Sequence, residues 1–272
     1  MSKDKSIKKI VPCLDTKDGR LVKGIKFVNI REVGDPPEYA KKYEEDGADV
    51  IVLLDISASI EGRETLLDVV KRTAKVINIP FAVGGGIKSI NNIETLLSAG
   101  TDKISINTAA VKDPNFVKEA VNKFGGDKII IAIDALRTPA DKEGKDKFII
   151  ESPQGNFWGN VVIYGGTKET GIDLVDWSIK MAEMGVGEIL FTSKDQDGTK
   201  DGFDIPLTRA VAENSKIPVT ASGGCGHPYH MFVALTEGKA TSALAASIFH
   251  YNQYTVKEVK EYLRGRGISF ER

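Results

Sequence analysis

The sequence predicts an α/β protein, a (β/α)8 TIM barrel built from two homologous half-barrels. Short apolar runs rich in β-branched residues alternate eight times with segments of helical period. One glycine-rich stretch occurs twice in the chain. Continuous apolar runs indicate strands that are buried on both faces, as in a parallel sheet. A length of 272 residues suits a single barrel of this kind.

The predicted elements follow one another at regular intervals. The strands are expected at 10–14, 50–54, 81–83, 103–106, 129–133, 188–192, 218–221 and 242–246. The helices, with apolar residues spaced three and four apart, are expected at 36–46, 61–77, 91–99, 115–124, 174–184, 206–214, 230–237 and 256–264. An open, doubly wound sheet is the alternative, but it would leave the internal repeat unexplained.

The internal repeat divides a single domain, 1–272, into halves of about 1–126 and 127–272. Both copies contain a strand, a glycine turn, a helix and a second strand. Asp15 and Asp134 also stand at corresponding strand ends. At a shift of 139 residues, Gly84 and Gly85 correspond to Gly223 and Gly224, and Asn107 and Thr108 to Ala246 and Ser247.

Composition excludes several classes of function. A net charge of −1 and a pI near 6.4 give no general attraction to nucleic acid or membranes. No apolar run reaches the ~20 residues that cross a bilayer, so a cytoplasmic protein is expected. The two cysteines form no CxxC pattern, and His227 and His230 lack acidic or cysteine partners. We therefore expect no metal site, and two solvent-exposed histidines.

The repeated stretch favours binding of anions. Successive glycines let the backbone approach a ligand closely, and a following helix presents free N–H groups. Two such devices predict a ligand with an anionic group at each end. In the barrel, Asp15 and Asp134 would end opposite strands and face one another across this ligand. Two facing carboxylates suit a proton relay, with one as base and the other as acid.

Two long connections follow predicted strands, at 18–34 and 137–166. The second contains an insertion at about 138–163, and within the connection 147–152 and 159–165 are expected to pair as a hairpin. Both connections would lie at the carboxyl ends of the strands, where barrel enzymes build their sites. Long loops there often act as lids over the substrate.

The motifs CLDTKDGRLVKG, LLDISAS, VGGGI, DKISINTAA, AIDA, GEILFTSKDQDGTKDG, ASGG and ALAASIFH occur in this order. The ordered set resembles the cyclase subunit of imidazole glycerol phosphate synthase over nearly the whole chain outside 138–156. The resemblance implies a lyase of histidine biosynthesis. Ammonia would react with a phosphoribulosyl-formimino aminoimidazole carboxamide ribotide, giving imidazole glycerol phosphate and aminoimidazole carboxamide ribotide.

The resemblance also implies roles for individual residues and no metal or organic cofactor. Asp134 would assist the attack of ammonia, and Asp15 would assist the later elimination and ring closure. Lys23 would belong to a first loop that closes over the substrate. The remaining implied substrate-binding and phosphate-binding residues are Asp55, Gly85, Gly86, Asn107, Thr108, Thr192, Asp197, Gly198, Ser222, Gly223, Gly224, Ala246 and Ser247.

The family takes its ammonia from a glutaminase subunit docked on the amino-terminal face of the barrel. A ring of alternating charges at that face gates the entrance, and its positions here are Lys9, Val50, Lys103 and Glu188. The family has an acidic residue where Val50 stands, so we predict a leakier or differently arranged gate. Asp102 matches a position that is implicated in signalling to the glutaminase.

Three alternatives stay open at the level of sequence. The sister isomerase of the same pathway shares the repeat, both aspartates and both phosphate sites, although SINTAA and TSKDQDGTKDG favour the cyclase. A glutaminase-coupled amidotransferase of polysaccharide synthesis is disfavoured by the intact CLD and AIDA motifs. A phosphate-binding barrel without catalysis, serving as a scaffold, is the third.

Overall fold

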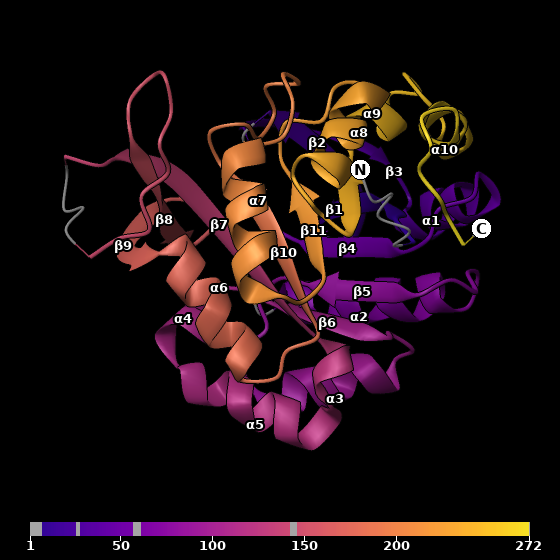
Figure 1. Cartoon of the computed structure of the whole chain (residues 1–272). Coiled ribbons are helices and arrows are strands. Elements are labelled where there is room, and N and C mark those ends of the chain that lie inside the picture. Colours follow the sequence, from indigo (N-terminus) through magenta and orange to yellow (C-terminus); the bar gives the residue numbers. More distant parts are fainter. Residues whose placement is uncertain (1–6, 26–27, 57–60, 142–145, 272) are drawn as a thin grey trace.

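The computed structural model describes residues 7–25, 28–56, 61–141 and 146–271. Eight parallel strands of this part of the chain form the barrel wall, and each coincides with a predicted apolar run (Figure 1). They are β1 (Lys9–Lys17), β4 (Ile51–Asp55), β5 (Phe81–Gly84), β6 (Lys103–Ile106), β7 (Ile129–Pro139), β10 (Glu188–Ser193), β11 (Val219–Ser222) and β12 (Ser242–Ala245).

The wall closes on itself, which confirms the barrel and excludes the open sheet. β10 pairs with β11 on one side and with β7 on the other, in register from Glu188↔Ile130 to Ser193↔Ala135. β1 pairs with β12 and with β4. Around this ring β1 and β7 are four strands apart in either direction, so the strands carrying Asp15 and Asp134 lie opposite one another.

Helices cover the outside of the wall (Figure 1). Their apolar faces pack on the outward side chains of the strands and form the main core with residues such as Tyr43, Phe81, Trp177 and Phe191. The longer helices are α1 (Pro36–Glu45), α2 (Glu61–Ala74), α3 (Ile90–Ser98), α5 (Pro114–Phe124), α6 (Leu174–Glu183), α7 (Ile205–Ser215), α8 (Pro228–Thr236) and α10 (Val256–Arg264).

A second, smaller core fills the inside of the barrel. Because side chains alternate along each strand, every other residue points inward. On six of the eight strands the inward residues in the middle are apolar, and they form a layer between the two ends of the barrel. They include Val11, Cys13, Val52, Ala82, Ile130, Leu190 and Leu244. On β6 and β11 the corresponding residues are the buried Ser105 and Thr220.

Four further strands extend the sheet beyond the barrel. β2 (Arg20–Ile25) pairs antiparallel with β1 and with β3 (Val28–Gly34). β8 (Phe157–Ile163) pairs antiparallel with β7 and with β9 (Lys168–Asp173), and stands out beside β7 in Figure 1. The expected pairing within 138–163 therefore differs in detail. Segment 147–152 meets β8 only at the bridge Ile150↔Phe157, because β7 and β9 already occupy both edges of β8.

Three short helical turns among the described residues were not predicted, because they are too brief to show a period. α4 (Thr108–Lys112) begins directly after β6, and α9 (Ser247–His250) follows β12. These turns lie 139 residues apart, as do the glycine turns before them. The third is η1 (Gly126–Lys128), before β7.

Candidate active site

A cavity of about 1340 Å³ opens at the carboxyl ends of the barrel strands. The predicted catalytic and binding residues meet around it, with one exception. The backbone of Lys23 lies in β2, and its side chain falls outside the described residues. The predicted residues that line the cavity are Asp15, Asp55, Gly85, Gly86, Asn107, Thr108, Asp134, Thr192, Asp197, Gly198, Ser222, Gly223, Gly224, Ala246 and Ser247.

The two predicted catalytic carboxylates share this rim, one on each side of the barrel. Asp15, near the end of β1, accepts a hydrogen bond from the Cys13 thiol, with 3.6 Å between Sγ and Oδ1. Asp134 on β7 accepts one from the Asn107 amide, with 3.0 Å between Nδ2 and Oδ2. Both carboxyl groups face the cavity, as a relay across a bound ligand requires.

The surroundings of the Asp134 carboxyl make it a stronger base than an ordinary aspartate side chain. Burial raises its pKa above the ordinary value, and the Asp197 carboxylate acts in the same direction. The Lys194 ammonium and the hydrogen bond from Asn107 oppose this rise without cancelling it. A carboxylate with a raised pKa holds a proton more readily, which favours its action as a general base.

The first glycine turn, 84–86, brings the backbone of β5 against that of β4. Gly85 has a φ of +102°, and a Cβ atom on it would overlap the carbonyl oxygen of Asp55. Gly86 has a φ of +63°, but no atom lies within 4 Å of the place where its Cβ would be. Gly85 is therefore needed for packing, whereas Gly86 presents its backbone to the open cavity.

The second glycine-rich region is assembled from two loops, 198–202 and 223–226. The Gly202 N–H donates to the Gly224 carbonyl at 2.8 Å. A Cβ on Gly224 would overlap the carbonyl oxygen of Gly202, and one on Gly226 would overlap that of Lys200. The two loops therefore touch through their backbones, which explains why glycines recur here.

Several cavity residues were not predicted from the sequence. Lys194, directly after β10, lies with its Nζ 3.2 Å from Asp197 Oδ2, and only 12% of its side chain is exposed. Its place in the polar run TSKDQDG was the available signal. Tyr164, in the turn between β8 and β9, donates its backbone N–H to Thr108 Oγ1 at 3.1 Å. Nothing local in the sequence indicates that contact across 56 residues.

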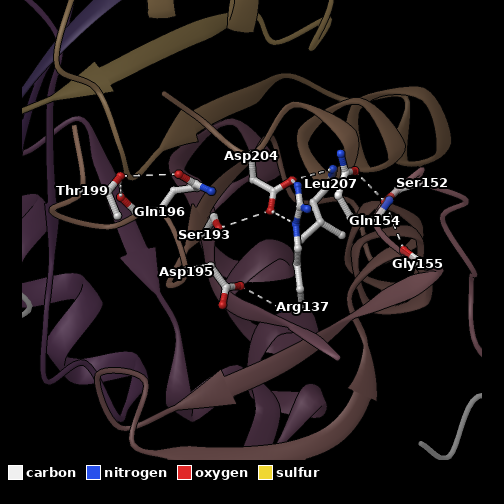
Figure 2. A network of polar contacts seen from close by, with 10 residues as sticks. All are labelled: Arg137, Ser152, Gln154, Gly155, Ser193, Asp195, Gln196, Thr199, Asp204 and Leu207. Carbon is white, nitrogen blue, oxygen red and sulfur yellow. Dashed lines mark hydrogen bonds and ion pairs between the residues drawn. The ribbon is translucent and has the colours of Figure 1, made fainter. Parts of the chain in front are cut away.

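A network of polar contacts fixes the end of β7 to the start of α7 (Figure 2). The Arg137 guanidinium donates to both oxygens of Asp204, with 2.7 Å to Oδ2 and 2.8 Å to Oδ1. The Asp204 side chain is fully buried, and its Oδ1 also accepts the Leu207 N–H at the start of α7. The Arg137 N–H donates to Asp195 at 2.7 Å. The segment between Asp195 and Asp204, which carries Asp197 and Gly198, is therefore held at both ends.

The predicted gate residues lie at the opposite, amino-terminal end of the barrel. Lys103 and Glu188 form an ion pair with 2.7 Å between Nζ and Oε2, and Glu188 also accepts the Thr220 hydroxyl at 2.7 Å. Among the described residues, no carboxylate pairs with Lys9. Val50 packs against the inner apolar layer instead of supplying a charge. Asp102 accepts the Phe81 backbone N–H at 2.8 Å, so this carboxylate also links β6 to β5.

The remaining predictions concern metals, histidines and membranes. No group of three potential metal ligands occurs among the described residues. His227 is exposed as expected, but the expectation for His230 is wrong, because that side chain is half-buried and accepts the Gly226 N–H at Nδ1. In the part of the chain that the structure covers, every helix is too short or too polar to cross a bilayer.

The fold, together with a cavity that has polar residues on both sides, places the protein among the (β/α)8 barrel enzymes. Comparison with known proteins identifies the family. The model of the family described as "Histidine biosynthesis protein" matches residues 9–255. This chain belongs to that family, and within it to the HisF subunits of imidazole glycerol phosphate synthase. It is thus an enzyme with the cyclase function in histidine biosynthesis.

Curated relatives from archaea cover almost the whole chain. The protein named imidazole glycerol phosphate synthase subunit HisF from Methanocaldococcus jannaschii is 52% identical over 264 residues, 96% of this chain and 97% of its own length. Its namesakes from Methanosarcina acetivorans and Methanococcus maripaludis are 53% and 51% identical, with the same coverage. None of these relatives is named as an isomerase or as an amidotransferase of polysaccharide synthesis. The name "subunit" implies that the synthase also contains a partner subunit.

Proposed function

We propose that the cavity binds a bisphosphorylated ribotide by its two ends and that ammonia attacks its middle. The substrate is the phosphoribulosyl-formimino aminoimidazole carboxamide ribotide of the family. Asp134 assists the attack of ammonia, and Asp15 assists the later elimination and ring closure. The observation that carries this proposal is the placement of both carboxylates on one rim, on opposite strands, with a glycine turn on each flank.

The two flanks of the cavity hold the two phosphates. Gly86, Asn107 and Thr108 bind one, and the loops with Gly198 and Gly224, together with Ala246 and Ser247, bind the other. Backbone N–H groups at such turns bind phosphate without needing a full positive charge. Asp55, Thr192 and Asp197 line the space between and orient the substrate by hydrogen bonds.

The test is an assay of the purified chain with the ribotide and ammonium salt, following the decay of the substrate's absorbance. Turnover that requires ammonia and yields imidazole glycerol phosphate supports the proposal. A chain that binds the ribotide but never converts it would be a scaffold instead. Asp15→Asn is expected to keep ribotide binding and lose turnover, because the amide cannot exchange a proton.

Lys194 is expected to set the pH at which Asp134 works. Lys194→Met removes the cation that opposes the rise in the pKa of Asp134, so this pKa rises further. As a base, Asp134 is then protonated over a wider acidic range, so the acidic limb of the activity profile should move to higher pH. The measurement is kcat/KM against pH. Lys200→Met, in the same cavity, is the matched control and should leave the profile unchanged.

We further propose that a glutaminase subunit docks on the amino-terminal face and passes ammonia through the barrel. The ion pair of Lys103 with Glu188 and the uncharged Val50 lie at that entrance. Ammonia would cross the inner apolar layer as the neutral molecule, since a charged group is costly to move into such surroundings.

Leakage of ammonia at the proposed gate should fall when position 50 carries a negative charge. Val50→Glu places a carboxylate directly before β4, at the ring of strand starts, where it can pair with Lys9. An ion pair of this kind contributes ~0.2–1 kcal/mol, so leakage of glutamine-derived ammonia should fall by a factor of about 1.5–5. The measurement is the ratio of ammonia released to product formed in the complex. Equal leakage from the original chain and from Val50→Gln and Val50→Glu would contradict this view of the gate.

A further inference from the structure

His230 lies beneath the two glycine loops of the second flank, outside the set of residues that face the cavity. It is on the first turn of α8, directly after loop 223–226. The Gly226 N–H donates to its Nδ1 at 3.1 Å. The side chain therefore holds the end of this loop.

The same ring also lies close to the other loop. A Cβ built on Gly202 would lie 3.7 Å from both Cγ and Cδ2 of His230, which is ordinary van der Waals distance. Gly202 is the residue whose N–H donates to the Gly224 carbonyl. The imidazole therefore lies beside the place where loops 198–202 and 223–226 meet.

We propose that His230 is a positioning residue for the second phosphate site. Its neutral ring holds loops 198–202 and 223–226 in register, so that Gly198 and Gly224 present their backbones to one phosphate group. This inference depends on the proposed bisphosphorylated substrate. His230 does not touch the reacting atoms, so its loss should weaken binding rather than the chemical step.

The proposed role requires a neutral imidazole ring, and the surroundings of His230 favour the neutral form. Nδ1 accepts a hydrogen bond from the Gly226 N–H, so the neutral ring carries its own proton on Nε2. Burial lowers the pKa of His230, and the neighbouring His227 acts in the same direction, while Asp201 and the Gly224 backbone oppose it. At neutral pH the ring is therefore neutral and able to accept.

Two substitutions test the role. His230→Leu keeps the bulk but cannot accept a hydrogen bond, whereas the Oε1 of His230→Gln can. We expect His230→Leu to raise KM for the ribotide about tenfold with kcat within about threefold, since a well-placed hydrogen bond contributes a factor of about this size. His230→Gln should restore KM to within about threefold of the original value.

The control is Thr236→Val on the same helix, which removes the hydrogen bond from the Thr236 hydroxyl to the Phe232 carbonyl but lies at the far end of α8. It should lower stability slightly and leave KM unchanged. A KM in His230→Leu within twofold of the original, or a fall in kcat without a change in KM, would overturn the proposal.

Amide hydrogen exchange at Gly226 tests the role of His230 independently of the proposed function. The pH dependence of KM provides a second measurement. Exchange at Gly226 should be about tenfold faster in His230→Leu, whether or not the ribotide is turned over. If the original chain shows no turnover, the proposed function fails, and exchange alone decides on His230. If His230→Leu does not fold, the KM of the original chain must rise below pH 6 more steeply than that of His230→Gln, which lacks the titrating ring. Identical profiles would overturn the proposal.

Discussion

Asp134→Asn is expected to lower turnover of the ribotide with ammonia by about 10²–10⁴-fold, the range that general acid–base catalysis contributes. The amide is isosteric with the carboxylate and keeps an oxygen for the Asn107 Nδ2–H, so the cavity should keep its shape. It cannot accept a proton from attacking ammonia. The dissociation constant of the ribotide should therefore stay within about threefold, which equilibrium binding and single-turnover rates would show.

The same variant should be more stable than the original chain at neutral pH. Burial raises the folded-state pKa of Asp134, so its contribution to stability is present in acid and lost as the pH rises through that pKa. Asn removes this cost, so the Tm of the variant at pH 7 should be higher than that of the original chain. The difference should vanish below the unfolded-state pKa of Asp. A variant that is both inactive and less stable at pH 7 would instead indicate damage to the fold.

Gly85→Ala and Gly86→Ala are expected to fail in different ways, although the residues are adjacent. In Gly85→Ala the new Cβ overlaps the Asp55 carbonyl oxygen, and a φ of +102° is unfavourable for alanine. β5 or β4 must shift, at a cost of about 3 kcal/mol or more. A fall in Tm of about 6–12 °C, measured by calorimetry, is the expected result.

Gly86→Ala should fold and bind poorly. A φ of +63° is accessible to alanine at a cost of ~1–2 kcal/mol, and no atom stands within 4 Å of the new Cβ. That Cβ projects into the cavity where the first phosphate is proposed to lie. KM should therefore rise at least about tenfold with a smaller loss of Tm than in Gly85→Ala. If Gly86→Ala leaves KM unchanged, the phosphate does not lie against this turn.

The barrel and the composition of its cavity follow from local pattern. Runs such as 129–133 and 188–192 are apolar throughout because both faces of a barrel strand are buried, and such runs need no knowledge of distant residues. Asp15 and Asp134 were found because each directly ends such a run, and the carboxyl ends of parallel strands meet on one rim.

Features that depend on distant contacts were not predictable in this way. The Arg137–Asp204 pair joins residues 67 positions apart, and neither residue stands in a distinctive pattern. β8 was expected to pair within the insertion, but it pairs with the part of β7 that extends beyond the barrel rim. His230 was expected in solvent because sequence spacing excludes a metal site but says nothing about backbone partners. The homology of the two halves and the role of each site residue stay predictions.

The apolar layer inside the barrel has a consequence for proton balance. Between the Lys103–Glu188 pair at one end and Asp134 at the other, the layer is mostly apolar, as Ala82, Ile130 and Leu190 show. Its polar groups include the hydroxyls of Ser105 and Thr220 and the Cys13 thiol, none of which carries a charge as a hydroxyl or thiol. The proposed passage of ammonia through the barrel would then deliver the neutral molecule, because ammonium would lose its hydration along this layer. A proton that this molecule does not carry would be drawn from the open cavity beside Asp134, and deuterated solvent should slow the step that uses it.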